Sequence, residues 1–154
     1  MNASFGTWIA LAVFLALCFG VAYLGAMFSP GEWHAALAKP SWNPPNWVFG
    51  PVWTVLYIMI AIAGWLVWKS APTSPAMWFW VAQLVFNGAW SWLFFGLHRM
   101  DLAFADIVLV WLAILAFIIA AWPISVTAAL LFVPYLIWVS FASALNYSIW
   151  SLNG

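Results

Sequence analysis

Charged residues are almost absent from this sequence. Asp, Glu, Lys and Arg make up 4 % of its 154 residues and 69 % are hydrophobic, whereas soluble domains carry about 25 % charged residues. Three Lys plus Arg and a formal net charge of zero leave no clustered basic surface of the kind that nucleic-acid binding needs. The composition therefore predicts an integral membrane protein without a nucleic-acid partner.

Residues that usually carry catalysis or bind metals are also scarce. The one cysteine, Cys18, excludes a disulfide within the chain. His and Cys do not occur at metal-ligand spacing, and there is no glycine-rich phosphate loop. We therefore expect no metal site and no required cofactor. Asp106 lies about one turn into an apolar run, where we expect a carboxylate that is either hydrated or stabilised by the dipole of the helix N-terminus, rather than a proton relay.

Long apolar runs are what the sequence does contain, and each is long enough to cross about 30 Å of hydrocarbon as a helix of about 20 residues. The predicted spans are residues 5–28, 46–69, 76–97, 102–122 and 126–150. The first run is longer than a signal-peptide core, so we expect it to be retained. The second span begins at Pro45, with Pro51 as a kink, or near Gly50, with Pro51 in the first turn. Pro134 should kink the last span or loosen its first turns.

The sequence thus predicts an all-α fold in one membrane domain, residues 1–154. It is a five-transmembrane-helix bundle with a long, partly helical loop between helices 1 and 2, and Asp101 is placed to cap the fourth helix. The loops on the side of the C-terminus hold Lys39 and Arg99, against Lys69 alone on the other side. This bias weakly favours an outside N-terminus and an inside C-terminus, and it does not identify the host membrane.

Aromatic and uncharged polar residues recur at helical spacing on three of the spans. They are Phe49, Trp53 and Tyr57 on the second span; Gln83, Asn87 and Ser91, flanked by Trp90 and Phe94, on the third; and Tyr135, Trp138 and Ala142 on the fifth. Polar side chains in lipid turn inward, so these faces are predicted to line one neutral, flat-walled cavity for a planar aromatic or sterol-like ligand. The alternative is that the tryptophans form interfacial belts and that Gln83 and Asn87 join helices.

A proline-rich segment at residues 39–57 interrupts the apolar sequence and excludes a regular helix over Pro40 to Pro45. It contains the element Trp42-Asn43-Pro44-Pro45-Asn46-Trp47, followed by Val52-Trp53-Thr54. Further along the chain come Gln83-Leu84 with Asn87, then Pro134-Tyr135-Leu136-Ile137-Trp138 and Leu145-Asn146-Tyr147. In this order the motifs resemble the translocator protein family (TspO/MBR), which includes bacterial tryptophan-rich sensory proteins and the peripheral benzodiazepine receptor. The resemblance covers nearly the whole chain.

The resemblance implies a membrane receptor or carrier, frequently dimeric, whose first loop folds over a pocket that accepts porphyrins such as protoporphyrin IX and haem. A role in porphyrin homeostasis or stress signalling follows from it. Trp53, Asn87, Trp138 and Ala142 match pocket positions of the family. The complete candidate ligand-binding set is Phe49, Trp53, Tyr57, Gln83, Asn87, Trp90, Ser91, Phe94, Tyr135, Trp138 and Ala142, with His34 and Trp42 from the loop. Gly88 and Ala89 make the third span a candidate dimer face.

Two alternatives accompany this interpretation. Some bacterial members are reported to break down porphyrin with light and oxygen, in which case Trp53 and Trp138 would be the catalytic residues; we expect a binding protein rather than an enzyme. Animal members bind sterols, but their motif needs a basic residue after the C-terminal tyrosine, and none follows Tyr147. His34 replaces the tyrosine usual in the family, and its imidazole is able to ligate haem iron, although a lone loop histidine more often only hydrogen-bonds.

Overall fold

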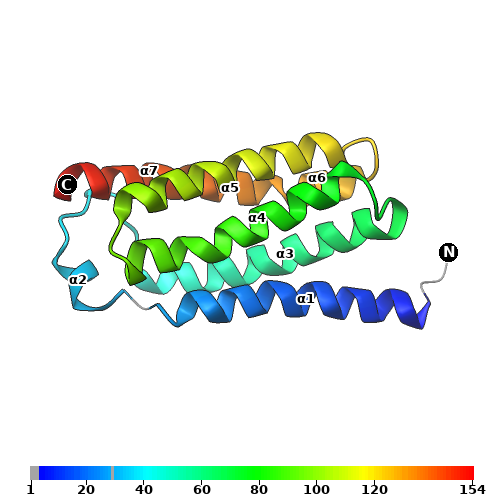
Figure 1. Cartoon of the computed structure of the whole chain (residues 1–154), viewed down its shortest axis with the longest axis horizontal. Coiled ribbons are helices and arrows are strands. Elements are labelled where there is room, and N and C mark those ends of the chain that lie inside the picture. The colour runs from blue at the N-terminus through cyan, green and yellow to red at the C-terminus, as the bar shows by residue number, and fades with distance from the viewer. Residues whose placement is uncertain (1–3, 29) are drawn as a thin grey trace.

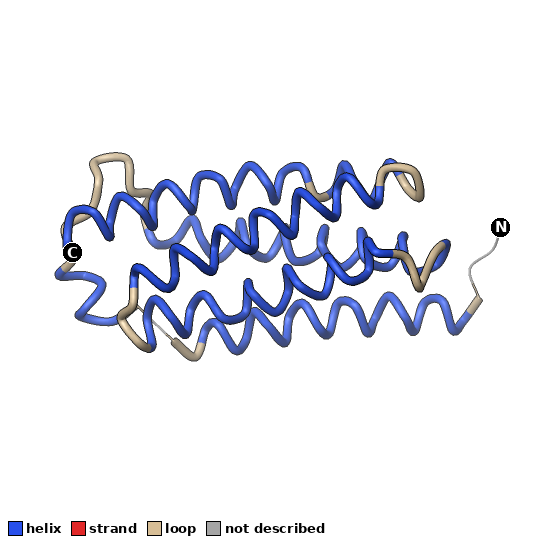
Figure 2. Tube along the Cα trace, turned by 45° about the horizontal axis from the view of Figure 1, so that its top comes forward, coloured by secondary structure: helices blue, strands red, loops and turns tan. Residues whose placement is uncertain are grey.

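The computed structural model describes residues 4–28 and 30–154 as an elongated bundle of helices (Figure 1). The elements are α1 (Phe5–Ala26), α2 (Gly31–Ala36), η1 (Asn46–Val48), α3 (Phe49–Ser70), α4 (Pro75–Ser91), η2 (Trp92–Gly96), α5 (Met100–Ala121), α6 (Val126–Leu131) and α7 (Val133–Asn153). No strand occurs among the residues described, and the turns gather at the two ends of the bundle (Figure 2). The predicted all-α fold is confirmed.

Four helical segments are long and apolar enough to cross a membrane. They are Phe5–Ala26, Asn46–Ser70, Met100–Ala121 and Val126–Asn153. The remaining predicted span, 76–97, falls on α4, which has 17 residues, and on the five-residue η2 that continues it. In η2 the Leu97 N–H donates to the Trp92 carbonyl at 2.8 Å, five residues back, which makes this turn π-helical.

Prolines decide where two of the helices begin. A single 3₁₀ turn, η1, follows Pro45, and α3 starts at Phe49, so Pro51 lies in its first turn and introduces no kink. Pro134 occupies the first turn of α7, and the helical run is interrupted just before it, at Phe132. This interruption is the loosening predicted for the last span.

The sequence prediction for the cap of the fourth span is wrong. Asp101 does not cap α5: the cap position is Arg99, which has no side-chain capping bond, and Asp101 instead accepts two hydrogen bonds from the Arg99 guanidinium at 3.0 and 2.8 Å. The Asp101 carboxylate therefore pairs with Arg99 instead of capping α5. At Gly88, one of the two small residues on the candidate dimer face, a Cβ would lie 3.3 Å from Val21 of α1 in the same chain, and the dimer face itself stays a prediction.

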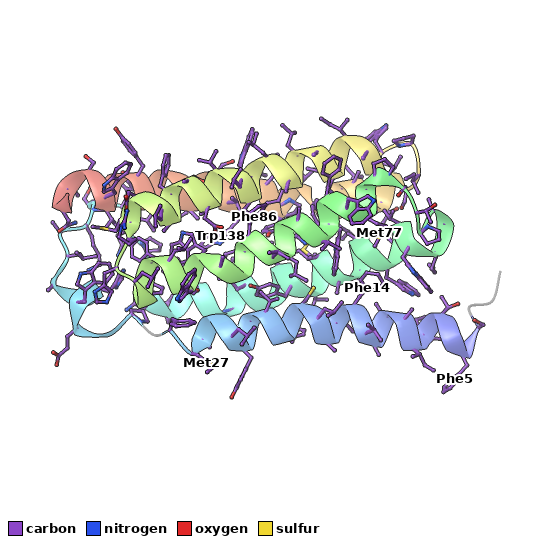
Figure 3. All side chains as sticks on the ribbon, in the orientation of Figure 1. Phe5, Phe14, Met27, Met77, Phe86 and Trp138 are labelled. Carbon is purple, nitrogen blue, oxygen red and sulfur yellow. The ribbon has the colours of Figure 1, made fainter. Side chains whose placement is uncertain are left out.

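The packed core lies among α3, α4, α5, α6 and α7, and α1 covers one side of it. On α1 the buried side chains are Phe14 and Cys18, whereas its outer face exposes large apolar residues such as Phe5 (Figure 3). α3 and α4 approach closely at Gly64, where the Trp80 indole takes the space that a side chain would fill and donates to the Ile60 carbonyl at 2.9 Å.

The loop between α1 and α3 lies across the end of the bundle where α7 finishes, opposite the start of α1 (Figure 1). Its short helix α2 confirms the expected helical piece. Trp33 of α2 stacks on His98 with ring centroids 4.0 Å apart and planes 4° apart. At the other end of the loop, Ala38 N–H donates to Asn153 Oδ1 at 2.9 Å and Asn153 Nδ2 donates to the Ala38 carbonyl at 2.7 Å. The loop is therefore attached to α7 and to the turn after η2.

Candidate ligand-binding cavity

An interhelical cavity of about 690 Å³ lies beneath the first loop. Its walls come from α1, the loop, η1, α3, α4, η2, α5 and α7, and apolar side chains dominate them. Small-molecule pockets typically measure about 300–1,000 Å³, with mostly apolar walls and a few placed polar groups. The cavity has the size and composition of a site for one hydrophobic molecule.

Aromatic rings form one wall of this cavity. Trp53 of α3 and Trp138 of α7 lie with ring centroids 6.5 Å apart and planes at 86°, and Phe49 meets Trp138 edge-on at 5.8 Å. Tyr57, one turn beyond Trp53, tilts against it at 5.5 Å. These side chains line the cavity together, as the i, i+4, i+8 spacing on α3 predicted. Trp138 lies between the helices in the half of the bundle nearer the loop (Figure 3).

A second aromatic surface comes from α4 and η2. Trp90 and Phe94 stack with centroids 4.9 Å apart and planes 23° apart. The Trp90 N–H donates to Asn146 Oδ1 at 2.9 Å, and Asn146 Nδ2 donates to the Met100 carbonyl at 3.1 Å. These hydrogen bonds hold the Trp90 ring in one orientation against the cavity.

A chain of hydrogen-bonded polar side chains begins at the cavity wall and continues into the packed core behind it. The Tyr57 hydroxyl donates to Asn87 Oδ1 at 3.1 Å, and Asn87 Nδ2 donates to the Tyr135 hydroxyl at 2.7 Å. Tyr135 donates to Gln83 Oε1 at 2.8 Å, and Gln83 Nε2 donates to the Trp80 carbonyl at 2.7 Å. Asn87 is thus held rigidly by two tyrosines, and its second N–H and a lone pair remain for a ligand.

The Trp138 indole N–H has no acceptor although its nitrogen is buried. The indole N–H groups of Trp65, Trp80, Trp90 and Trp111 all donate to acceptors at 2.8–2.9 Å. A buried donor without a partner costs about 1–3 kcal/mol. Trp138 borders the cavity through its ring, but its nitrogen is not exposed to that space, so a bound molecule would meet the ring and not the N–H.

Most of the candidate ligand-binding residues border the cavity. They are His34, Phe49, Trp53, Tyr57, Asn87, Trp90, Ser91, Phe94, Trp138 and Ala142. Gln83 and Tyr135 are fully buried behind it in the hydrogen-bond chain, and Trp42 packs on Phe141 with ring centroids 5.5 Å apart. Helical spacing placed Gln83 and Tyr135 on the correct face, but neighbouring side chains separate them from the cavity.

The wall contributed by α1 was not predicted. Phe19, Ala22, Gly25 and Ala26 border the cavity, and none of them was among the candidate ligand-binding residues. The apolar sequence of α1 has no polar residue that would mark this face. The small size of Ala22, Gly25 and Ala26, which leaves room beside the helix, was the available signal.

The Asp106 side chain is buried, which disagrees with the hydrated carboxylate that was one of the two alternatives predicted for it. The side chain is 6 % exposed and its Oδ2 has no hydrogen-bond partner. It lies on the buried face of α5, beside the cavity-lining Ile107, and does not itself border the cavity. Position near a helix end indicated hydration, but the packing of α5 against α4 and α7 buries this turn as well.

His34 of α2 forms part of the roof. Its ring meets Phe94 and Phe95 edge-on, with centroids 6.2 and 5.4 Å apart. Burial, and secondarily the positive charge of Lys39, lowers the pKa of His34 below its ordinary value. The loop therefore favours a neutral imidazole at the cavity. Within residues 4–28 and 30–154 no three His, Cys, Asp or Glu side chains group to hold a metal ion.

The comparison with known proteins agrees with this architecture. Residues 12–151 match the TspO/MBR family. Protein CrtK of Rhodobacter capsulatus is 40 % identical over 146 residues, which cover 92 % of this chain and 91 % of that protein. The tryptophan-rich sensory protein of Cereibacter sphaeroides is 41 % identical over 146 residues, with 95 % and 92 % covered. The human translocator protein is 41 % identical over 139 residues, with 85 % and 82 % covered.

The chain belongs to the TspO/MBR family, as its motifs predicted. Together with the long apolar helices, this membership makes it a multi-pass integral membrane protein.

Proposed function

We propose that this protein is a membrane receptor or carrier for a flat hydrophobic tetrapyrrole, such as protoporphyrin IX or haem, and that it serves porphyrin homeostasis or stress signalling. The observation that carries the proposal is the aromatic, largely apolar cavity in which Trp53 and Trp138 lie 6.5 Å apart. Flat apolar walls favour a planar apolar ligand, since stacking and edge-to-face contacts add to the free energy of burial.

The few polar groups of the cavity fit the same class of ligand. A tetrapyrrole carries ring nitrogens, which offer acceptors to the free N–H of Asn87. No hydrogen bond of the surrounding protein has to be broken for this contact.

The proposal includes five membrane spans and a homodimer. Residues 75–96, formed by α4 and η2, would span about 33 Å at about 1.5 Å per residue, which is enough to cross the hydrocarbon core. The Leu97 to Trp92 hydrogen bond keeps the backbone of η2 satisfied, as lipid requires. Analytical ultracentrifugation in detergent would test the dimer.

Titration with protoporphyrin IX, followed by the absorbance of the porphyrin, tests the function. The Trp53→Phe/Trp138→Phe double variant should bind at least about 10-fold more weakly, because it removes two indoles worth on the order of 1 kcal/mol each beyond area burial. The matched control is Trp78→Phe/Trp122→Phe, which removes two exposed indoles outside the cavity. Equal affinity of the two double variants would refute the site.

A second candidate function is oxidative breakdown of the porphyrin with light and oxygen. The observation in its favour is that the Trp53 and Trp138 indoles are perpendicular neighbours that both line the cavity. Illumination of the aerobic complex should then produce a bilin-like absorbance that the Trp53→Phe/Trp138→Phe variant lacks. Bleaching at the rate of free porphyrin would reject this function and leave binding intact.

A further inference from the structure

The first loop lines a second, largely open cavity, of about 560 Å³, next to the interhelical one. Pro30, His34, Asn43 and Asn46 border both cavities, so the two are adjacent and the side chains of these four residues stand between or beside them. Lys39 borders the loop cavity and does not border the interhelical one. The lining thus changes from aromatic rings inside to an ammonium, an imidazole and two amides at the mouth.

The Lys39 ammonium is held at this mouth by two backbone carbonyls. Its Nζ donates to the carbonyl of His34 at 2.6 Å and to that of Leu37 at 3.3 Å. An ammonium has three N–H donors, so one remains after these bonds. Both partners are neutral, and no carboxylate of the described residues lies within 4.0 Å of Nζ. The loop therefore holds a positive charge without compensating it.

The other two basic residues of the chain are placed differently. Arg99 pairs with Asp101 at 2.8 Å, and Nζ of Lys69 lies 3.8 Å from the centroid of the Trp65 ring at the end of α3. Neither borders the interhelical or the loop cavity. Lys39 thus combines an uncompensated charge with a position at the cavity mouth.

We propose that Lys39, together with His34, Asn43 and Asn46, binds the carboxylate groups of the ligand at the mouth of the cavity. The ligand class is then a planar hydrophobic acid, whose ring lies between the helices and whose acid groups face the loop. This inference rests on the proposed tetrapyrrole function and narrows it to ligands with free carboxylates. A carboxylate accepts several hydrogen bonds, and those from an ammonium are about twice as strong as neutral ones.

The neighbours of Lys39 favour this arrangement. The lowered pKa of His34 makes its imidazole neutral, so it donates a hydrogen bond without adding a second charge to the loop. Pro40, Pro44 and Pro45 restrict the backbone around the amides of Asn43 and Asn46, which lowers the entropy lost when they orient toward a ligand.

Comparison of protoporphyrin IX with its dimethyl ester tests the proposal, because the two share one ring and differ in carboxylate charge. In phosphatidylcholine nanodiscs the native protein should bind the diacid about 5- to 10-fold more tightly than the ester, the range expected for charge-assisted bonds at a partly exposed site. Lys39→Met should weaken binding of the diacid to the level of the ester. Lys39→Arg should retain the preference, and Lys69→Met should leave both affinities unchanged.

The outcomes separate this inference from the proposed function. Binding of both porphyrins with equal affinity by the native protein would overturn the carboxylate subsite and leave the tetrapyrrole function standing. An equal loss of diacid and ester affinity in Lys39→Met would show that Lys39 only holds the loop, which also overturns the subsite. Binding of neither porphyrin would overturn both. If Lys39→Met does not fold, added salt must weaken diacid binding alone to the native protein, and equal salt effects would refute the subsite.

Discussion

The close approach of α3 and α4 at Gly64 makes a strong prediction for a single added methyl group. In Gly64→Ala the new Cβ would lie 2.5 Å from Trp80 Nε1, 2.6 Å from Trp80 Cε2 and 3.0 Å from Phe14 Cε1. Carbon contacts are optimal at about 3.5–4.0 Å, so the indole must move by on the order of 1 Å. Trp80 is 2 % exposed and donates to the Ile60 carbonyl, so it has no free space to enter and would lose this bond.

Three contributions determine how much Gly64→Ala changes the free energy of unfolding. Overpacking of a core costs about 1–3 kcal/mol. Leaving the buried Trp80 N–H without its acceptor costs about another 1–3 kcal/mol, while replacing glycine by alanine within a helix recovers about 1 kcal/mol. We expect Gly64→Ala to lower the free energy of unfolding by about 1–5 kcal/mol. Gly20→Ala is the matched control, because no atom lies within 4 Å of the Cβ position and the helix gain remains.

Cys18 supplies the assay. It is the one cysteine of the chain and is 0 % exposed, so a thiol-reactive fluorescent dye reports unfolding during a temperature ramp in detergent. At about 2–4 °C per kcal/mol, Gly64→Ala should lower Tm by roughly 2–20 °C, and Gly20→Ala should hold or raise it. If the two variants melt together, the Trp80 indole is free to move and the reasoning fails.

Three further predictions concern the cavity and its roof. Trp138→Phe replaces an indole of the cavity wall by a smaller ring, so protoporphyrin IX should bind about 3- to 10-fold more weakly, while Tm of the free protein should change little because the indole N–H has no hydrogen bond to lose; a Tm fall as large as that of Gly64→Ala contradicts this. Asn153→Ala removes two bonds to the loop, and hydrogen exchange of residues 31–39 should accelerate; unchanged exchange would mean that the loop is held elsewhere. Because the pKa of His34 is lowered by burial and then by Lys39, loop docking is fully stable above the ordinary histidine pKa of about 6.5 and weakens as pH falls below it. The protection factors of the loop amides, which correct for the pH dependence of intrinsic exchange, should therefore fall between about pH 7 and 5, and His34→Phe should abolish that fall, measured in a His98→Asn background that removes the other histidine.

Much of the fold was predictable because lipid restricts the chain to structures that satisfy their own backbone hydrogen bonds. Apolar runs of sufficient length had to be helices, and the breakers between them marked the ends to within a few residues. Pro51 and Pro134 then decided local detail, since proline is tolerated in a first turn and not in the interior of a helix. The same composition accounts for the scarcity of catalytic groups.

The sequence predicted which face of α3, α4 and α7 points toward the candidate site. It did not predict which side chains on that face reach the cavity and which are buried behind it. Tyr135 and Trp138 share a stripe on α7, yet the Tyr135 hydroxyl is enclosed by Asn87 and Gln83 while the Trp138 ring reaches the cavity. Periodicity determines the direction in which a side chain leaves its helix. The distance to the facing helix depends on how the helices cross, which sequence spacing does not encode.

The sequence by itself determined that this protein is a helical membrane protein of the TspO/MBR family, with tryptophans on inward faces and a stiff loop rich in proline. Tertiary structure alone decided that α1 supplies a wall through Ala22 and Gly25, that Asp106 is buried, and that Lys39 stands uncompensated at the cavity mouth. The physical reason is that burial and charge compensation depend on neighbours from distant parts of the chain, which only the packed bundle brings together.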